Sequence, residues 1–166
     1  MSHAITALIL PDPISAEAAD RWDLVAVPLP GDLTLLHVTH YYTAYWQARL
    51  GISSYLEIPS EAPGRPGLFP REGVVTTIAI ELAARPDSSF AVVLTDYFGG
   101  TGEQWAAMSI GGRPVRSVNS INTALRALGV RATAGSDEFD TVGLAAHRST
   151  PDYLDRYIDL CDELGV

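Results

Sequence analysis

The sequence predicts an α+β fold: a single domain over residues 1–166, with a mixed, largely antiparallel sheet packed against helices. Three observations favour this class. A length of 166 residues suits one domain, because domains commonly hold about 100–200 residues. Hydrophobic residues make up 47% of the chain and charged residues 19%, as in an ordinary globular protein. The order of elements mixes hairpins with helices, which favours antiparallel pairing.

The N-terminal third is predicted to be mainly strand. The apolar run Ala4–Leu10 ends at a Pro-Asp-Pro turn and therefore predicts a strand. Ser15 can cap a short helix that runs to about Trp22, because its side-chain oxygen accepts a hydrogen bond from a free backbone N–H. Leu24–Leu29 and Leu33–Val38 predict a hairpin near a sheet edge, since prolines cannot complete a strand ladder.

Two helices are predicted in the middle of the chain. Thr39–Leu50 carries aromatic residues at helical spacing, with its first residue as the N-cap and Gly51 just beyond its end. Apolar residues also recur at helical spacing over Val74–Leu82, and Pro86 stops that helix. Between the two, Pro59–Pro70 holds four prolines and two glycines and predicts a long loop.

The next part of the chain returns to strands. Phe90–Tyr97 alternates and is rich in β-branched residues, which predicts a central strand, and Gln104–Ile110 predicts its neighbour. Ser117 or Asn119 can cap the helix that follows. Gly129 is expected to end that helix in the left-handed conformation.

The last segment predicts an amphipathic helix with Thr150 as N-cap and Pro151 at the first helical position. Its apolar face holds Cys161, the single cysteine, which we expect to be a buried structural thiol rather than a nucleophile. One cysteine excludes an internal disulfide and a cysteine-rich zinc site. The opposite face carries the aspartates Asp152, Asp155, Asp159 and Asp162.

The charge balance excludes several classes of function. Twenty acidic residues outnumber eleven basic ones, the net charge is −9, and every basic residue is an arginine. Without lysine there is no P-loop lysine, Schiff-base lysine or lysine general base. An acidic protein is a poor ligand for nucleic acid but can attract a basic protein partner.

No apolar run approaches the roughly 18 residues of a membrane span, and the N-terminus lacks signal-peptide features, so the expected compartment is the cytoplasm.

The most unusual segment is Thr95–Trp105, where a predicted strand runs into three glycines within four positions. It matches neither a Walker motif nor a dinucleotide-binding motif. Two interpretations stay open. The segment is either a wide hairpin connection or a rigid loop that presents Asp96, Glu103 and Gln104 to a ligand or partner.

Three parts of the C-terminal half resemble small bacterial immunity proteins, the partners of secreted toxins. They are the glycine segment (Tyr97-Phe98-Gly99-Gly100 and Gly102-Glu103-Gln104), Asn122–Val130 and Asp137-Glu138-Phe139-Asp140. The resemblance implies a non-enzymatic inhibitor with an acidic face. Such proteins are too diverse for residue roles to be carried over.

The leading hypothesis is therefore a soluble acidic binding protein of the immunity type, which masks a basic toxin by steric and electrostatic occlusion. Eight of the 20 acidic residues fall in the final 30 positions, offset only by Arg148 and Arg156. Charge speeds association while a buried aromatic residue supplies affinity, so Phe139 would be the anchor. The expected contact residues are Glu103, Asp137, Glu138, Phe139 and Asp140, with no cofactor and no metal.

The alternative hypothesis is enzymatic. His37-Val38-Thr39 and His147-Arg148-Ser149 resemble the motifs of two-histidine phosphoesterases, although the second has an arginine at its centre. The resemblance implies that His37 and His147 act as general base and general acid on a cyclic phosphate, while the hydroxyls of Thr39 and Ser149 hold its oxygens. The two imidazoles would then share one cleft at about 5–8 Å. Under the leading hypothesis we expect that they do not.

Two further alternatives remain. His37 and His40 form a His-x-x-His pair that could bind a metal if a third ligand came from His147, Asp96 or Glu103. We expect instead that these histidines are structural. The chain could also be a small structural or regulatory domain without a ligand. His3, near the N-terminus, is expected to carry no role.

Overall fold

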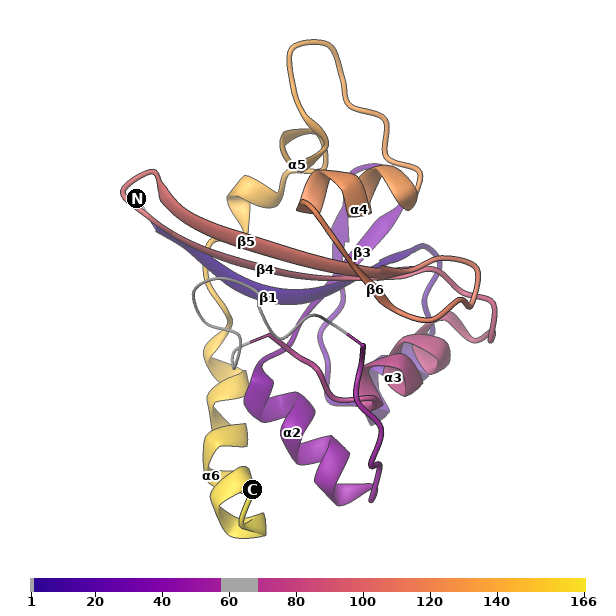
Figure 1. The fold of residues 1–166 in the computed structure, drawn as a ribbon, viewed down its shortest axis with the longest axis vertical. Coiled ribbons are helices and arrows are strands. Elements are labelled where there is room, and N and C mark those ends of the chain that lie inside the picture. The colour runs from indigo at the N-terminus through magenta and orange to yellow at the C-terminus, as the bar shows by residue number, and fades with distance from the viewer. Residues whose placement is uncertain (1, 58–68) are drawn as a thin grey trace.

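The computed structural model describes residues 2–57 and 69–166, and their strands form one antiparallel sheet (Figure 1). Within the described residues the sheet has six strands in the order β2-β3-β1-β4-β5-β6. The α+β prediction is confirmed. The strands are β1 (Ser2–Pro11), β2 (Val27–Leu29), β3 (Leu33–His37), β4 (Phe90–Phe98), β5 (Thr101–Ser109) and β6 (Arg116–Val118).

Helices cover both faces of the sheet. In the view of Figure 1, α2 (His40–Arg49), α3 (Val74–Ala83) and α6 (Arg156–Leu164) lie below it, while α4 (Ile121–Ala127) and α5 (Glu138–Thr141) lie above. The short α1 (Ala16–Arg21) packs against α3. Two 3₁₀ turns, η2 (Leu144–Ala146) and η3 (Asp152–Asp155), precede α6. Among the described residues, no helix is long and apolar enough to cross a membrane.

Strand alternation divides the buried side chains into two cores. On β1, Leu8 and Leu10 point into the lower core, between the sheet and α1, α2, α3 and α6, whereas Ala7 and Ile9 point into the upper core, beneath α4 and α5. On β4, the predicted central strand, Val92 belongs to the lower core and the residues on either side of it to the upper core. Both central strands are therefore apolar on both faces, which requires helices above and below.

Several predicted helix ends are confirmed. Ser15 accepts a hydrogen bond from the backbone N–H of Ala18 at 3.1 Å, and Thr39 caps α2 in the same way. Gly51 and Gly129 both have positive φ. The helix that was expected to stop at Pro86 ends close to that residue, because α3 ends at Ala83.

Three predicted boundaries are wrong. In each case the residues at the predicted boundary belong to a neighbouring element. Ser120, not Ser117 or Asn119, caps α4, since Ser117 is still paired within β6. The α-helix at the end of the chain starts at Arg156 rather than after Thr150, because its first turn, Asp152–Asp155, is the 3₁₀ helix η3. The strand predicted at Leu24 begins three residues later, because the N–H of Leu24 closes the end of α1.

The glycine segment forms neither a wide connection nor a presenting loop. β4 and β5 continue to Phe98 and Thr101, and only Gly99 and Gly100 turn between them, with φ of 62° and 84°. Two successive positive φ angles make the tight turn that suits the twist of a hairpin. The side chains of Asp96 and Glu103 therefore belong to the sheet. The predicted loop Pro59–Pro70 lies outside the described residues, except for its last two positions.

We predict that alanine at either turn glycine destabilises the protein. Gly99→Ala and Gly100→Ala should each cost about 1 kcal/mol, because an L side chain is strained at positive φ. For a chain of this size, that lowers the melting temperature by roughly 2–4 °C. Thermal unfolding of each variant measures the loss.

The control is Gly99→Asn, which should cost less because asparagine tolerates the left-handed region. Gly102→Ala should cost more than either turn variant, since a Cβ there would collide with the backbone of Asp96 and Tyr97. Equal melting temperatures for all four variants would contradict the tight turn.

Candidate functional site

A cavity of about 310 Å³ lies beneath the sheet, between β1, β4 and β5 above it and the beginnings of α2 and α6 at its sides. Strand alternation places the side chains of Leu94 and Asp96 on the lower face, while the Thr95 hydroxyl between them bonds to His3 on the upper face. The chain around η3 forms the opposite wall. Most of the wall is apolar. Its apolar residues include Ala4, Leu94, Trp105, Tyr41, Leu154 and Ile158.

The polar groups of this cavity come from separate elements. Asp96 lies on β4 and Asp155 on η3, and the hydroxyl residues Thr6, Thr39 and Thr150 complete the lining with His40. Burial lowers the pKa of His40, against an opposing effect of Glu72. At pH 7 the imidazole is therefore mostly neutral, and the two aspartates supply the charge of the cavity.

Asp96 has a second carboxylate beside it. Glu103 is its direct cross-strand partner, so both side chains project from the lower face of the sheet. Like charges placed opposite each other destabilise a strand pair. No described residue forms an ion pair with either carboxylate. Near this pair, Phe98 is 79% exposed at the end of the same hairpin.

The predicted acidic face of the last helix is exposed. It carries Asp152, Asp155, Asp159, Asp162 and Glu163. Arg156, the basic residue of this segment, forms an ion pair with Asp23. Asp23 also accepts a hydrogen bond from the Tyr157 hydroxyl at 2.6 Å. Exposed apolar side chains accompany the acids: Ile158 is 39% exposed, and Tyr41 of α2 is 37% exposed. Both of these line the cavity.

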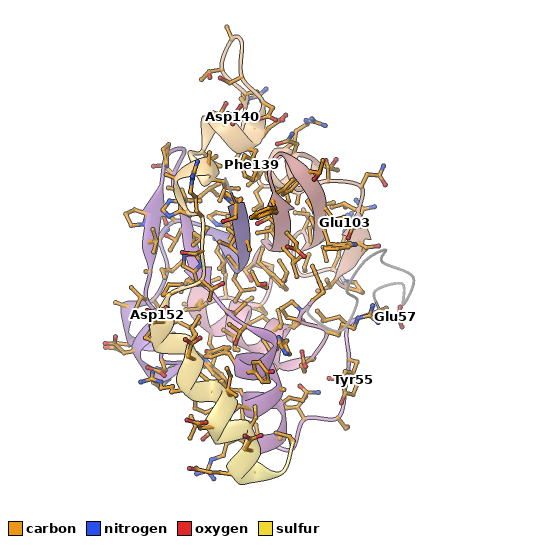
Figure 2. The ribbon with its side chains drawn as sticks, turned by 90° about the vertical axis from the view of Figure 1, so that its left-hand side faces the viewer. Tyr55, Glu57, Glu103, Phe139, Asp140 and Asp152 are labelled. Atoms are coloured by element: carbon orange, nitrogen blue, oxygen red, sulfur yellow. The ribbon has the colours of Figure 1, made fainter. Side chains whose placement is uncertain are left out.

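The five predicted contact residues do not lie on one surface. Figure 2 shows Phe139 and Asp140 near the top of the molecule, Glu103 lower and to the right, and Asp152 near the start of the last helix. Glu103 faces below the sheet, whereas α5, with Asp137 as its N-cap, lies above it.

Most of the predicted contact groups around α5 have internal partners. The Asp137 carboxylate accepts hydrogen bonds from the Asp140 N–H at 2.9 Å and from Asn122 at 3.1 Å, and these bonds lower its pKa. Glu138 is buried and bonds to Arg126 at 2.9 Å, which lowers its pKa. Phe139 is half-buried and packs against His3, with ring centroids 5.5 Å apart.

His37 and His147 lie close together on the upper face, contrary to our expectation. Their ring centroids are 6.4 Å apart, within the range that the phosphoesterase hypothesis requires. The remaining geometry differs from that hypothesis. His37 is only 5% exposed, and the Thr39 hydroxyl caps α2 and lines the cavity below the sheet. The Nδ1 atom of His37 is buried without a partner among the described residues. Burial, with a smaller contribution from His147, lowers the pKa of His37 to about 4.

The other candidate groups do not come together in one site. His37 faces the upper core while His40 lines the lower cavity, so the His-x-x-His pair does not converge. Within the described ranges, no three potential metal ligands come together. Cys161 is buried, as predicted, and its Sγ lies 3.2 Å from the carbonyl oxygen of Tyr41.

His3 is the residue that sequence reasoning missed. Its Nε2 donates to the Leu144 carbonyl at 2.9 Å, and its Nδ1 accepts from the Thr95 hydroxyl at 2.7 Å. The Thr95 oxygen in turn accepts from the Ile5 N–H. His3 thus ties β1 and β4 to η2. The sequence contains a signal for this contact. Because side chains alternate along a strand, a histidine next to an apolar strand projects from one of the two faces of the sheet.

We predict that His37 makes the protein less stable as the pH falls from about 6.5 to about 4. Its folded pKa lies below the ordinary value, so the unfolded chain takes up the proton first, and stability present above pH 6.5 is lost. The ceiling of this loss is roughly 3 kcal/mol. Urea unfolding at several pH values measures it.

His37→Leu should remove this part of the pH dependence without lowering stability at pH 7, because it deletes an unpartnered buried nitrogen. His147→Gln should remove only the smaller, electrostatic part. An unchanged slope in His37→Leu would show that the imidazole is solvated.

In comparisons with protein-family models, curated proteins and solved structures, nothing matched the chain. The function must therefore follow from the geometry of its own side chains, and the cavity beneath the sheet combines apolar walls with two carboxylates.

Proposed function

We propose that this chain is a binding protein of the immunity type, which inhibits a basic bacterial toxin by covering its active surface. One observation carries the proposal. The cavity beneath the sheet is bordered by exposed apolar side chains, Tyr41 and Ile158, and by carboxylates, Asp96 and Asp155. A hollow that combines apolar walls with uncompensated negative charge suits a protruding basic residue of a partner.

The acidic face of η3 and α6 extends this site. Its aspartates stand beside the cavity and point to solvent, and Arg156 is held by Asp23. Negative surface of this kind attracts a basic protein from a distance and speeds association. Tight binding then requires apolar contact, which the exposed Ile158 can supply.

This placement revises the expected docking surface. The carboxylates of Asp137 and Glu138 serve the capping of α5 and the bond to Arg126, so removing their charge would disturb the fold itself. The lower side of the sheet, with Glu103 and the α6 acids, supports docking without such a cost. We therefore place the partner below the sheet.

We expect the gene immediately upstream to encode a large secreted toxin, and co-expression of this chain to protect cells from it. With that toxin as partner, Asp152→Asn combined with Asp159→Asn should slow association severalfold at low salt and have little effect at high salt. Ile158→Ala should instead speed dissociation. Stopped-flow binding or surface plasmon resonance measures both rates.

Asp140→Asn and Phe139→Ala are the matched controls, because both lie above the sheet. If these controls slow association or speed dissociation as much as the α6 variants do, the partner docks on α5. If co-expression gives no protection, the inhibitor hypothesis is wrong.

The separation of 6.4 Å between His37 and His147 supports a second candidate, a phosphodiester hydrolase. The pair could act as general base and general acid on a phosphate placed between them. It ranks second because His37 is almost wholly buried and the Thr39 hydroxyl lies on the other side of the sheet.

Hydrolysis of a cyclic phosphodiester by the purified chain tests this candidate. If the pair is catalytic, His37→Ala and His147→Ala should each lower the rate by roughly 100-fold or more, while His40→Ala leaves it unchanged. Activity that survives both substitutions, or no activity at all, would exclude the dyad.

A further inference from the structure

The cavity beneath the sheet concentrates negative charge in a small apolar space. Asp96 lies on one wall and Asp155 on another, and the described lining residues include no arginine. His40 also lines the cavity. Its imidazole is mostly neutral at pH 7, because burial lowers its pKa. Low-dielectric walls strengthen the field of the two carboxylates, so the cavity favours a cation.

A third carboxylate reinforces this preference. Glu103 stands opposite Asp96 in the strand ladder and projects from the same face. Two neighbouring carboxylates repel each other, and a cation bound between them relieves the repulsion. The arrangement is thus unfavourable in the free protein and favourable in a complex.

The size and walls of the cavity select the shape of the cation. A volume of about 310 Å³ lies at the low end for ligand sites, so it suits one long side chain rather than a larger molecule. Leu94, Leu154 and Ile158 offer an apolar surface for an aliphatic stem.

The aromatic lining distinguishes guanidinium from ammonium. Trp105 and Tyr41 contribute aromatic rings to the lining, and the Tyr41 ring contacts His40 with centroids 4.0 Å apart. A guanidinium group is planar, weakly hydrated and able to stack on such rings while its N–H groups reach carboxylates. An ammonium group is a compact, strongly hydrated charge that gains less from flat apolar walls.

We propose that this cavity binds the side chain of an arginine that protrudes from the partner protein. The inference deepens the proposed function and rests on it for the source of the arginine. Free arginine is a poorer ligand, because its carboxylate group would enter the field of the acidic rim.

An NMR titration of the ¹⁵N-labelled full chain tests the proposal with four probes: acetyl-Gly-Arg-Gly-amide, the same peptide with lysine, the same peptide with citrulline, and free arginine. The indole N–H of Trp105, identified by its loss in Trp105→Phe, reports binding. We expect roughly millimolar affinity for the arginine peptide, weaker binding of the lysine peptide, and about tenfold weaker binding of the uncharged citrulline peptide.

Variants then locate the site. Asp96→Asn and Asp155→Asn should each weaken the arginine peptide about fivefold or more, because each removes one carboxylate partner. Asp140→Asn and Glu17→Gln are the matched controls, because both carboxylates are exposed and lie outside the cavity lining, and they should change the affinity less than twofold. Asp96→Asn should fold normally, since it relieves the repulsion from Glu103.

Three outcomes would overturn the inference: equal affinity for the arginine and citrulline peptides, equal weakening by the control variants, or no shift of Trp105 up to about 20 mM peptide, a range that covers weak single-side-chain binding. Tighter binding of free arginine than of the peptide would overturn the assignment to a partner protein. None of these outcomes affects the co-expression test, so a failure here is separable from a failure of the proposed function.

Discussion

The ladder between β1 and β4 is the interaction on which the rest of the structure depends. It aligns Ser2–Ile9 with Ala91–Phe98, and these two strands occupy the centre of the sheet. Both are apolar on both faces, so neither face can be left to water. The helices below and above the sheet follow from this requirement. The position of the cavity follows as well, because it forms where the ladder extends beyond the lower core toward the hairpin turn.

The acidic residues of this chain fall into two groups. Some carboxylates accept hydrogen bonds inside the fold: Glu72 accepts from the Thr43 hydroxyl, Glu81 from the Trp22 indole, and Asp137 from the N-terminus of α5. Others, such as Asp96, Glu103 and the aspartates of α6, have no internal ion pair among the described residues. The first group stabilises the fold, and this accounts for part of the acidic composition of the chain. The second group lies mainly below the sheet and supports an electrostatic role.

Local sequence patterns predict the helices and strands well, but they predict poorly which of these elements contact each other. Ser15 and Thr39 were recognisable as caps because capping depends on a few consecutive residues. The bridge between Ser149 and Ala4 is not visible in the sequence, because it joins positions far apart in the chain. For the same reason, the sequence grouped Asp137–Asp140 with the aspartates of α6, although the sheet separates them. The cavity could not be foreseen, since it draws on β1, β4, β5, α2 and η3 together.

The central position of β1 has a consequence for synthesis on the ribosome. β1 is synthesised before the other described strands and can soon pair with β3, which in turn pairs with β2. Its other edge pairs with β4, which is made roughly 80 residues later. During that interval the nascent chain carries a long apolar strand edge with unsatisfied backbone groups, the kind of surface that joins other chains. An unpaired β1 edge during synthesis is thus a consequence of placing this strand at the centre of the sheet.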